Sequence, residues 1–432
     1  MTTAPEPASP RQSGGLSRGD GILVAAASII AALSNFVIMF LGTRTLPAAS
    51  GTEFLAFWSL LTGMFGVISG VQNETTRAVG AVASGARRGV RAIGPSLIIG
   101  VIVALIILAL TPVIGQRIVP ISGGTALPAL VITTVAYSAY VTLVGSFGGQ
   151  GWWSHYASLL ASEVILRMLL MGTVLVIGAY LGGYVLACAG ATAILFIFLV
   201  FSRRSRQAFI SRADDNLLAM VRKNLLAVVS TSCTAILITG YGAILTGVAH
   251  GSEPLLLGGL ILAVSLTRAP IMIPLTAFTG VAIKLFLGHR DAPMKAIVKP
   301  VGALLGLGII GGAAAWVIGP WFVGIFNPGY HIAGWVFGAL TFSSAIIAIL
   351  TLFGTLVLAL DAHVIYAVGW LIASAVAIGI LLSPVGLALR VVLSLSVGPT
   401  VGCLVMLAWL AITAGAQKPE DQQTVGHNDL QN

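Results

Sequence analysis

Apolar residues form long runs along the chain, and short polar stretches separate these runs. A membrane-spanning helix needs about 20 consecutive apolar residues, and twelve runs reach that length. The pattern therefore predicts an all-α polytopic membrane protein with 12 transmembrane helices. The predicted spans are residues 21–43, 54–76, 93–115, 126–148, 157–178, 181–202, 223–247, 255–283, 299–320, 333–357, 364–383 and 386–413.

The polar segment RRSRQAFISRADDN divides these spans into two groups of six. Within each group, the longest basic loop follows the second helix, and short turns join pairs of helices. Such a rhythm is typical of transporters built from repeats. We expect two pseudo-symmetric six-helix lobes around a central cavity. The predicted parts are a disordered tail at 1–20, an N-lobe at 21–202, a basic linker at 203–222, a C-lobe at 223–413 and a second tail at 414–432.

Composition agrees with a membrane protein, because 57% of the residues are hydrophobic and only 8% are charged. A soluble protein carries about 25% charged residues, so this chain cannot cover a surface that faces water. The three cysteines lie inside apolar runs, and no Cys or His spacing resembles a metal site. We therefore expect no metal, no cofactor and no catalytic residues.

Basic residues predict the orientation in the plasma membrane. Most of the 22 Lys and Arg residues fall on segments that share the side of the N-terminus. Basic loops stay on the cytoplasmic side, so we expect both termini in the cytoplasm. The net charge of +9 follows from this rule and from contact with the anionic inner leaflet of the lipid bilayer. It gives no reason to expect a nucleic-acid partner.

The stretch LTRAPIMIPL, residues 266–275, places an arginine inside the eighth span. An ionisable residue there costs about 2.5–3.5 kcal/mol. Arg268 lies about 20 Å from the outer end by the helical rise, and no acidic residue follows or precedes it at helical spacing. We expect it to face a hydrated cavity and bind an anion; the alternative is a structural partner such as Glu163. Pro270 and Pro274 each remove a backbone donor, which predicts a helix hinge.

Two other pairs of opposite charge occur at helical spacing. Glu163 and Arg167 are four residues apart in the fifth span, so they can form an ion pair. That pair is either a structural bridge or part of a cavity. Glu74 and Arg77 lie one turn apart at the inner end of the second span. They form an ion pair at the headgroup level, or else at most two of the residues Gln72, Asn73 and Glu74 line the inner end of a central vestibule.

Two arginines lie near the predicted outer interface. Arg44 ends the first span, and Arg390 lies a few residues inside the outer end of the last. An interfacial anchor explains Arg44, and a side chain that extends to the interface explains Arg390. A position inside a cavity remains the alternative for both.

Three segments carry a resemblance to a known family. They are SLTRAPIMIPLTAFTGVAIK in the eighth span, GPWFVGIFNPGY before the tenth, and GQGWWSHYASLLASEVILRMLL from the fourth to the fifth. Together with the six-plus-six pattern, they resemble the multidrug/oligosaccharidyl-lipid/polysaccharide (MOP) exporter superfamily, and within it the Wzx-type flippases of bacterial polysaccharide biosynthesis. The third segment, with Arg167, resembles actinobacterial members.

This resemblance implies transport by alternating access. The cargo would be a polyprenyl-phosphate- or diphosphate-linked sugar, turned from the inner to the outer leaflet for cell-envelope glycan assembly. Lipid II flippases of the superfamily hold the diphosphate with cavity arginines. The resemblance gives this role to Arg268, and through weaker local matches to Arg167, Arg44 and Arg77. A guanidinium suits it because it binds phosphate through two hydrogen bonds.

The resemblance also implies partners and a driving force. We expect a monomer, together with a glycosyltransferase of the same pathway. Glu74 and Glu163 are the carboxylates available for coupling to a proton or sodium gradient, and the membrane potential is the alternative. A drug or metabolite exporter of the superfamily is a second interpretation, although the first span lacks an acidic residue after Asp20. A membrane glycosyltransferase is a third, although the first outer loop offers only Glu53.

Overall fold

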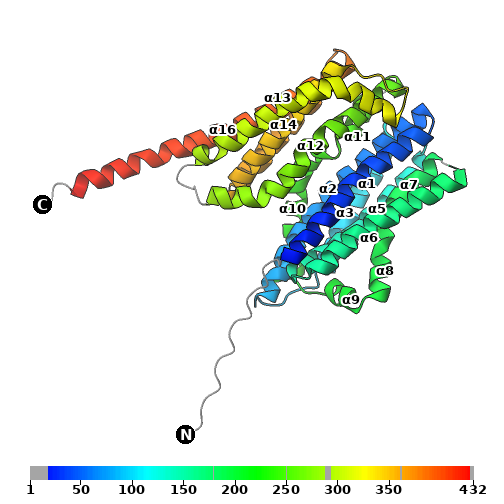
Figure 1. The fold of residues 1–432 in the computed structure, drawn as a ribbon. Helices are drawn as coiled ribbons and strands as arrows, with labels where there is room; N and C mark the ends of the chain where they lie inside the picture. The colour runs from blue at the N-terminus through cyan, green and yellow to red at the C-terminus, as the bar shows by residue number, and fades with distance from the viewer. Residues whose placement is uncertain (1–17, 179, 250, 288–292, 361, 429–432) are drawn as a thin grey trace, which may run out of the picture. The chain divides into compact units, whose positions relative to one another are not determined.

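The structure is a computed structural model that describes residues 18–178, 180–249, 251–287, 293–360 and 362–428. These residues form α-helices joined by short turns, with one short 3-10 helix and one isolated antiparallel bridge (Figure 1). The predicted all-α polytopic membrane fold is confirmed. The predicted N-terminal tail lies outside the described residues, apart from 18–20, which begin the first helix.

Within the described residues, eleven helices are long and apolar enough to cross a membrane. Helices α3 (Ile93–Ala109) and α4 (Thr111–Arg117) meet at an angle of 59°, and counted together as one broken span they bring the number to twelve. The twelve predicted spans match these elements in order. The remaining helices are α1 (Arg18–Thr45), α2 (Ala48–Ala83), α5 (Gly123–Gly149), α6 (Trp153–Gly178), α7 (Leu181–Gly190), η1 (Ala191–Ala193), α8 (Ile194–Phe201), α9 (Arg203–Phe209), α10 (Leu217–Ile238), α11 (Tyr241–Val248), α12 (Pro254–Leu287), α13 (Pro293–Phe326), α14 (Gly334–Ala359), α15 (His363–Leu381) and α16 (Leu387–Asn428).

The seventh span differs in detail from its prediction at 223–247. Helix α10 begins earlier, at Leu217, because the side chain of Asn216 accepts a hydrogen bond from the amide of Ala219 and caps the first turn. The helix then ends at Ile238, and α11 follows after a break. The basic linker is also partly helical, since α9 lies within it. At the other end of the chain, α16 continues into the predicted C-terminal tail.

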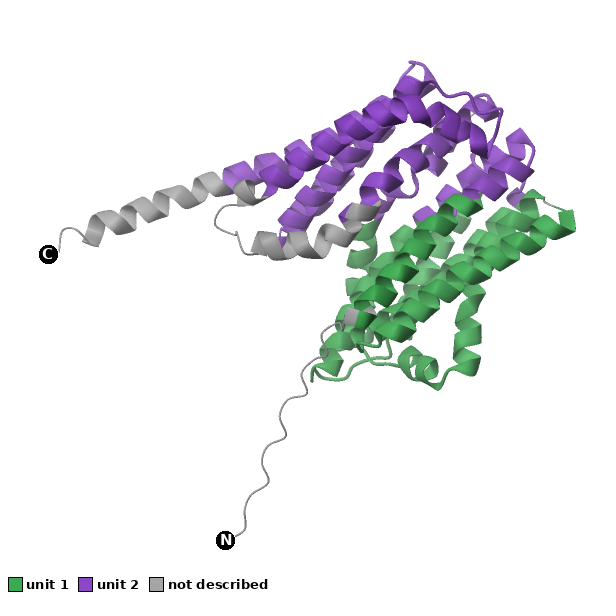
Figure 2. Cartoon of the chain, in the orientation of Figure 1, with its two compact units in different colours: residues 1–38, 64–111, 124–231 green, residues 39–63, 112–123, 232–432 purple. Residues whose placement is uncertain are grey.

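Two compact units make up the chain (Figure 2). Unit 1 contains residues 1–38, 64–111 and 124–231, and unit 2 contains residues 39–63, 112–123 and 232–432. The division crosses α1, α2 and α10. Each unit therefore combines segments from both halves of the sequence.

In unit 1, α6 packs against α7, η1 and α8. Helix α3 leaves apolar side chains uncovered: Leu105, Ile106 and Leu108 are each more than half exposed. A soluble protein seldom exposes such a continuous apolar face. Such a face, on a strongly apolar helix, is suited to lipid tails.

In unit 2, α14 is the central helix, because α12, α13 and α16 all pack against it. Helix α15 packs along α16. Helix α13 has an uncovered apolar face that includes Ile310, Val317 and Trp321. Fully buried aromatic residues of this unit include Trp370 on α15 and Phe337 on α14. Apolar residues of this unit thus form a core, for example on α14 and α15, and also an uncovered face on α13 that is suited to lipid tails.

Candidate functional site

The break between α10 and α11, in unit 2, is held by side chains from two other helices. Arg268 of α12 donates a hydrogen bond from Nη1 to the carbonyl oxygen of Ile238. Ser59 of α2 donates to the carbonyl of Thr239 (2.8 Å) and accepts from the amide of Ala243 (3.2 Å). The last carbonyl groups of a helix have no hydrogen-bond donor within the helix. Here the side chains of Arg268 and Ser59 donate to them. The guanidinium also lies at the negative end of the α10 dipole.

Glycines let α2 approach this break closely. A Cβ atom on Gly63 would lie 2.9 Å from the Cα atom of Gly240, closer than real side chains approach. Ser59 and Gly63 are one turn apart, so both are on the face of α2 that contacts the break. The position of the break relative to α2 is therefore determined by backbone contact as well as by hydrogen bonds.

Arg268 retains one free edge of its guanidinium. Its side chain is buried, with 8% exposure. Nε and Nη2 have no hydrogen-bond partner among the described residues, and no carboxylate there forms a salt bridge with Arg268. Those two nitrogens form one side of the planar group, the side that binds two oxygens of a phosphate or carboxylate. Buried donors without acceptors are costly, so this edge is suited to an anion.

The two prolines beside Arg268 lie within α12, which continues past both. Pro270 is exposed. The side chain of Pro274 lies outside the described residues. Nothing in this helix tests bending, so the hinge stays a prediction.

Glu163 and Arg167 form the ion pair that their spacing predicts, in unit 1. Both side chains are buried. The guanidinium of Arg167 also lies over the ring of Phe65, 5.8 Å from its centroid. That ring stacks on Tyr137 at 3.9 Å. Because Glu163 neutralises Arg167, and Phe65 covers it, this arginine is less suited than Arg268 to bind a second anion.

Glu74 and Arg77 also pair as predicted, at the end of α2 in unit 1. Arg77 Nη2 lies 2.6 Å from Glu74 Oε1, and Nη1 lies 2.8 Å from Asp214 Oδ2 in the linker. The hydrogen bond from Arg77 lowers the pKa of Asp214 below its ordinary value. Asn73 is exposed. A third carboxylate, that of Asp215, lies 3.8 Å from Nη2. Arg77 is thus engaged by three carboxylates, and its phosphate-binding role stays a prediction.

A backbone clip between the loop 86–92 and the linker segment 211–215 was missed by the sequence analysis. The amide of Gly89 donates to Ala213 (2.7 Å) and the amide of Ala213 to Val90 (2.8 Å). Two further bonds join Val90 to Asp215 and Ala92 to Ser211. We call this pairing the linker clip. Its one sequence signal was the acidic pair Asp214–Asp215 inside a basic segment.

The remaining charged candidates of unit 2 lie at helix ends. Arg44 is exposed in the last turn of α1, where an interfacial anchor would lie. Arg390 is half-buried and donates from Nη1 to the carbonyl of Leu381 at the end of α15 (3.2 Å). Glu53 is buried and accepts hydrogen bonds from the amides of Ile121 and Ser122 and from the Ser122 hydroxyl, at 2.6–2.8 Å. Its carboxylate therefore holds a loop.

Comparison with known sequences finds relatives from mycobacteria. The chain is 30% identical over 405 residues to "Uncharacterized protein Rv1510" of Mycobacterium tuberculosis strain H37Rv, and the match covers 92% of this chain and 93% of that protein. It is 29% identical over 423 residues to "Uncharacterized protein Rv3630" of the same strain, and that match covers 95% of this chain and 96% of the other protein. No protein-family model matches the sequence.

Comparison with solved structures finds transporters of the MOP superfamily. An inward-facing multidrug resistance MATE family transporter matches with a TM-score of 0.64 at 16% identity, over 95% of this chain and 97% of that one. An outward-facing MATE family transporter matches with a TM-score of 0.57, also at 16% identity, over 94% and 99%. A MOP superfamily transporter from Pyrococcus furiosus, reported with a binding pocket of reversed polarity, matches with a TM-score of 0.57 at 15% identity. The match covers 94% of this chain and 100% of that one. These likenesses show that the chain has the MOP transporter fold.

Proposed function

The chain belongs to the family of the mycobacterial protein Rv1510, and we propose that it is a transporter for lipid-linked sugars. It turns a polyprenyl-phosphate- or diphosphate-linked sugar from the inner to the outer leaflet of the plasma membrane. It works by alternating access, and the product serves cell-envelope glycan assembly. Both termini lie in the cytoplasm, and the chain acts as a monomer beside a glycosyltransferase of the pathway.

The observation that carries this proposal is the free edge of Arg268. Nη1 is fixed on Ile238, while Nε and Nη2 have no partner among the described residues. A guanidinium fixed in this way presents two parallel donors to a phosphate without losing further side-chain entropy. The polyprenyl tail can remain in lipid, so only the phosphate and the sugar need polar partners. Arg268 is therefore the phosphate-binding residue of the proposal.

The other predicted residues take supporting roles in the proposal. Glu163 and Glu74 are the candidates for coupling to a proton or sodium gradient, since both carboxylates already balance a cation, Arg167 or Arg77. Protonation of Glu163 would remove the salt bridge to Arg167, whereas Arg77 would keep its salt bridge with Asp214. The membrane potential is the alternative driving force. Asn73 and Arg44 are exposed and would contact the head group only at the two membrane surfaces.

Two alternatives receive less support. A membrane glycosyltransferase needs an acidic residue available in an outer loop, and the hydrogen bonds on Glu53 occupy its carboxylate. An exporter of cationic drugs would use a buried carboxylate whose oxygens have no other partner. In the described chain, the buried carboxylates Glu53 and Glu163 both have partners. A buried guanidinium with a free edge instead favours an anionic cargo.

A flipping assay tests the proposal. Purified protein would be reconstituted into liposomes with a fluorescent polyprenyl-phosphate sugar or its diphosphate analogue, and a membrane-impermeant reductant would report the outward-facing fraction. We expect R268A to slow flipping at least tenfold, because hydrogen bonds to a charged group contribute about 1.5–3 kcal/mol each. Flipping at the wild-type rate by folded R268A would contradict the proposal.

Arg390 provides a matched control. It too donates from Nη1 to the last carbonyl of a helix, that of Leu381 in α15. If Arg268 only capped α10, R268A and R390A would have similar effects on flipping and on thermal unfolding. The proposal expects R390A to keep most of the flipping activity. Export of cationic drugs without flipping of either phosphate carrier would favour the drug-exporter alternative.

A further inference from the structure

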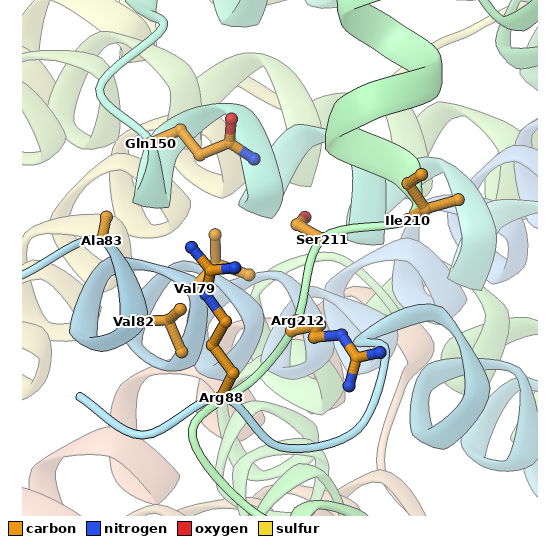
Figure 3. A pocket seen from close by; sticks show the side chains of 8 residues that line it. All are labelled: Val79, Val82, Ala83, Arg88, Gln150, Ile210, Ser211 and Arg212. Carbon is orange, nitrogen blue, oxygen red and sulfur yellow. The ribbon is translucent and has the colours of Figure 1, made fainter. Parts of the chain in front are cut away.

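A basic pocket opens beside the linker clip in unit 1 (Figure 3). Its volume is about 430 Å³, within the range of small-molecule sites. Arg88 and Arg212 both line the pocket, and they come from the two segments that the clip joins. The lining residues are Val79, Val82, Ala83, Arg88, Gln150, Ile210, Ser211 and Arg212.

The lining comes from helix ends that share one membrane surface. Val79 and Val82 belong to the last turns of α2, and Gln150 directly follows α5. Ile210 directly follows α9 in the linker. Both α2 and α5 end on the predicted cytoplasmic side. The pocket is thus placed at the level where lipid head groups of the inner leaflet lie.

Charge in the pocket is not balanced by nearby carboxylates. Glu74, Asp214 and Asp215 form salt bridges with Arg77 and Lys223. No salt bridge in the described chain involves Arg88 or Arg212. Arg212 donates from Nη1 to the carbonyl of Gly89 (3.1 Å). This bond does not use Nε or Nη2 of Arg212. The pocket is therefore suited to an anion such as a phosphate group.

Exposed apolar residues also lie on the segments before and after the pocket's linker residues. Ile210, in the lining, is 53% exposed. Phe201 at the end of α8 is 84% exposed, and Leu218 at the start of α10 is 80% exposed. A soluble phosphate ligand has no apolar part that could contact such a surface. A phospholipid carries both a phosphate and acyl chains. Charge and apolar surface together favour a lipid.

We propose that this pocket binds the phosphate of an anionic phospholipid from the inner leaflet. Arg88 holds the phosphate from the loop side and Arg212 from the linker side. Because the clip joins these two segments, the bound head group strengthens their pairing. The linker connects the two halves of the sequence, so lipid composition then determines how firmly it is held to unit 1. This site is separate from Arg268 and does not depend on which cargo is transported.

Neighbouring arginines give a matched test. Arg87 and Arg88 are adjacent and both exposed, but only Arg88 lines the pocket. The binding of fluorescent phosphatidylglycerol to the purified full-length protein would be measured in neutral detergent, with phosphatidylcholine as reference. We expect R88Q to raise the Kd for phosphatidylglycerol about fivefold, since one basic residue at a membrane surface contributes about that factor. R87Q should leave it within twofold.

Hydrogen exchange and competition by a soluble phosphate ester add two further measurements to the binding test. Hydrogen exchange at the amides of Gly89 and Ala213 should slow when phosphatidylglycerol is added to wild-type protein or R87Q, but not to R88Q. Arg88 makes no clip hydrogen bond, so R88Q leaves the clip itself intact. Equal affinity of R87Q and R88Q would overturn the proposal. It would also be overturned if soluble glycerol 3-phosphate displaced the lipid at similar concentrations, because the site would then bind free phosphate esters.

Discussion

Arg268 donates a hydrogen bond to the carbonyl of Ile238, the last residue of α10. This contact leaves the two edges of the guanidinium in different surroundings. Nη1 completes the end of a helix, and the opposite edge, Nε and Nη2, remains without a partner among the described residues. A cap needs only one donor, so the second edge is what requires a functional explanation.

Replacement of Arg268 by lysine separates charge from geometry. R268K keeps the positive charge but can no longer bond Ile238 and two phosphate oxygens in one plane. We expect the affinity for a polyprenyl-phosphate sugar to fall about tenfold or more, from the loss of at least one charge-assisted hydrogen bond. R268Q should bind still more weakly. Binding to the purified variants measures this, and equal affinity of R268K and wild type would show that charge alone suffices.

The pair Glu163–Arg167 gives a prediction on stability. Removing one partner of a buried ion pair leaves an uncompensated charge, which costs about 3–5 kcal/mol. We therefore expect E163A to lower the thermal unfolding temperature strongly. The double variant E163L/R167M should recover most of the loss, because neither charge remains. Thermal unfolding in detergent measures both, and a double variant less stable than E163A would show that Arg167 has a separate structural role.

Hydropathy predicted the spans because each must match the thickness of the bilayer, a constraint that acts on every run alone. The break at Ile238 was not predicted, since its carbonyls are satisfied by Ser59 and Arg268, from helices remote in sequence. The extension of α10 to Leu217 was missed as well. The cap at Asn216 follows two aspartates, and their polarity suggested a loop.

The same limit applies to the candidate site. Spacing along a helix predicted the ion pairs Glu74–Arg77 and Glu163–Arg167, and both are present. It could not predict that Arg77 also binds Asp214, which lies 137 residues away. Nor could it predict the free edge of Arg268, because its surroundings come from α2, α10 and α11 as well as from α12. Local contacts follow from periodicity, whereas contacts between distant segments need the fold.

Gly89 provides a test of the linker clip. A Cβ atom at this position would lie 1.9 Å from the carbonyl oxygen of Asp215, so G89A must displace one segment. Overpacking of this kind costs about 1–3 kcal/mol. We expect faster hydrogen exchange at Val90 and Ala213 and faster proteolysis of the linker. Gly94 is the control, because a Cβ there meets no atom within 4 Å, and G94A should leave both rates unchanged.

Asp214 makes the clip sensitive to acid. The hydrogen bond from Arg77 lowers the pKa of Asp214 below its ordinary 3.8, so the folded protein holds this carboxylate ionised more firmly than the unfolded chain does. The resulting stabilisation is complete above the ordinary value and is lost as the pH falls through the lowered pKa. We expect hydrogen exchange at Ala213 and Val90, corrected for the intrinsic pH dependence, to be constant from neutral pH to about pH 5 and to accelerate below 3.8. D214N lacks the carboxylate, so it should exchange faster than wild type at neutral pH and lose the acid-dependent step. A step of the same size in D214N would assign the acid sensitivity to another group.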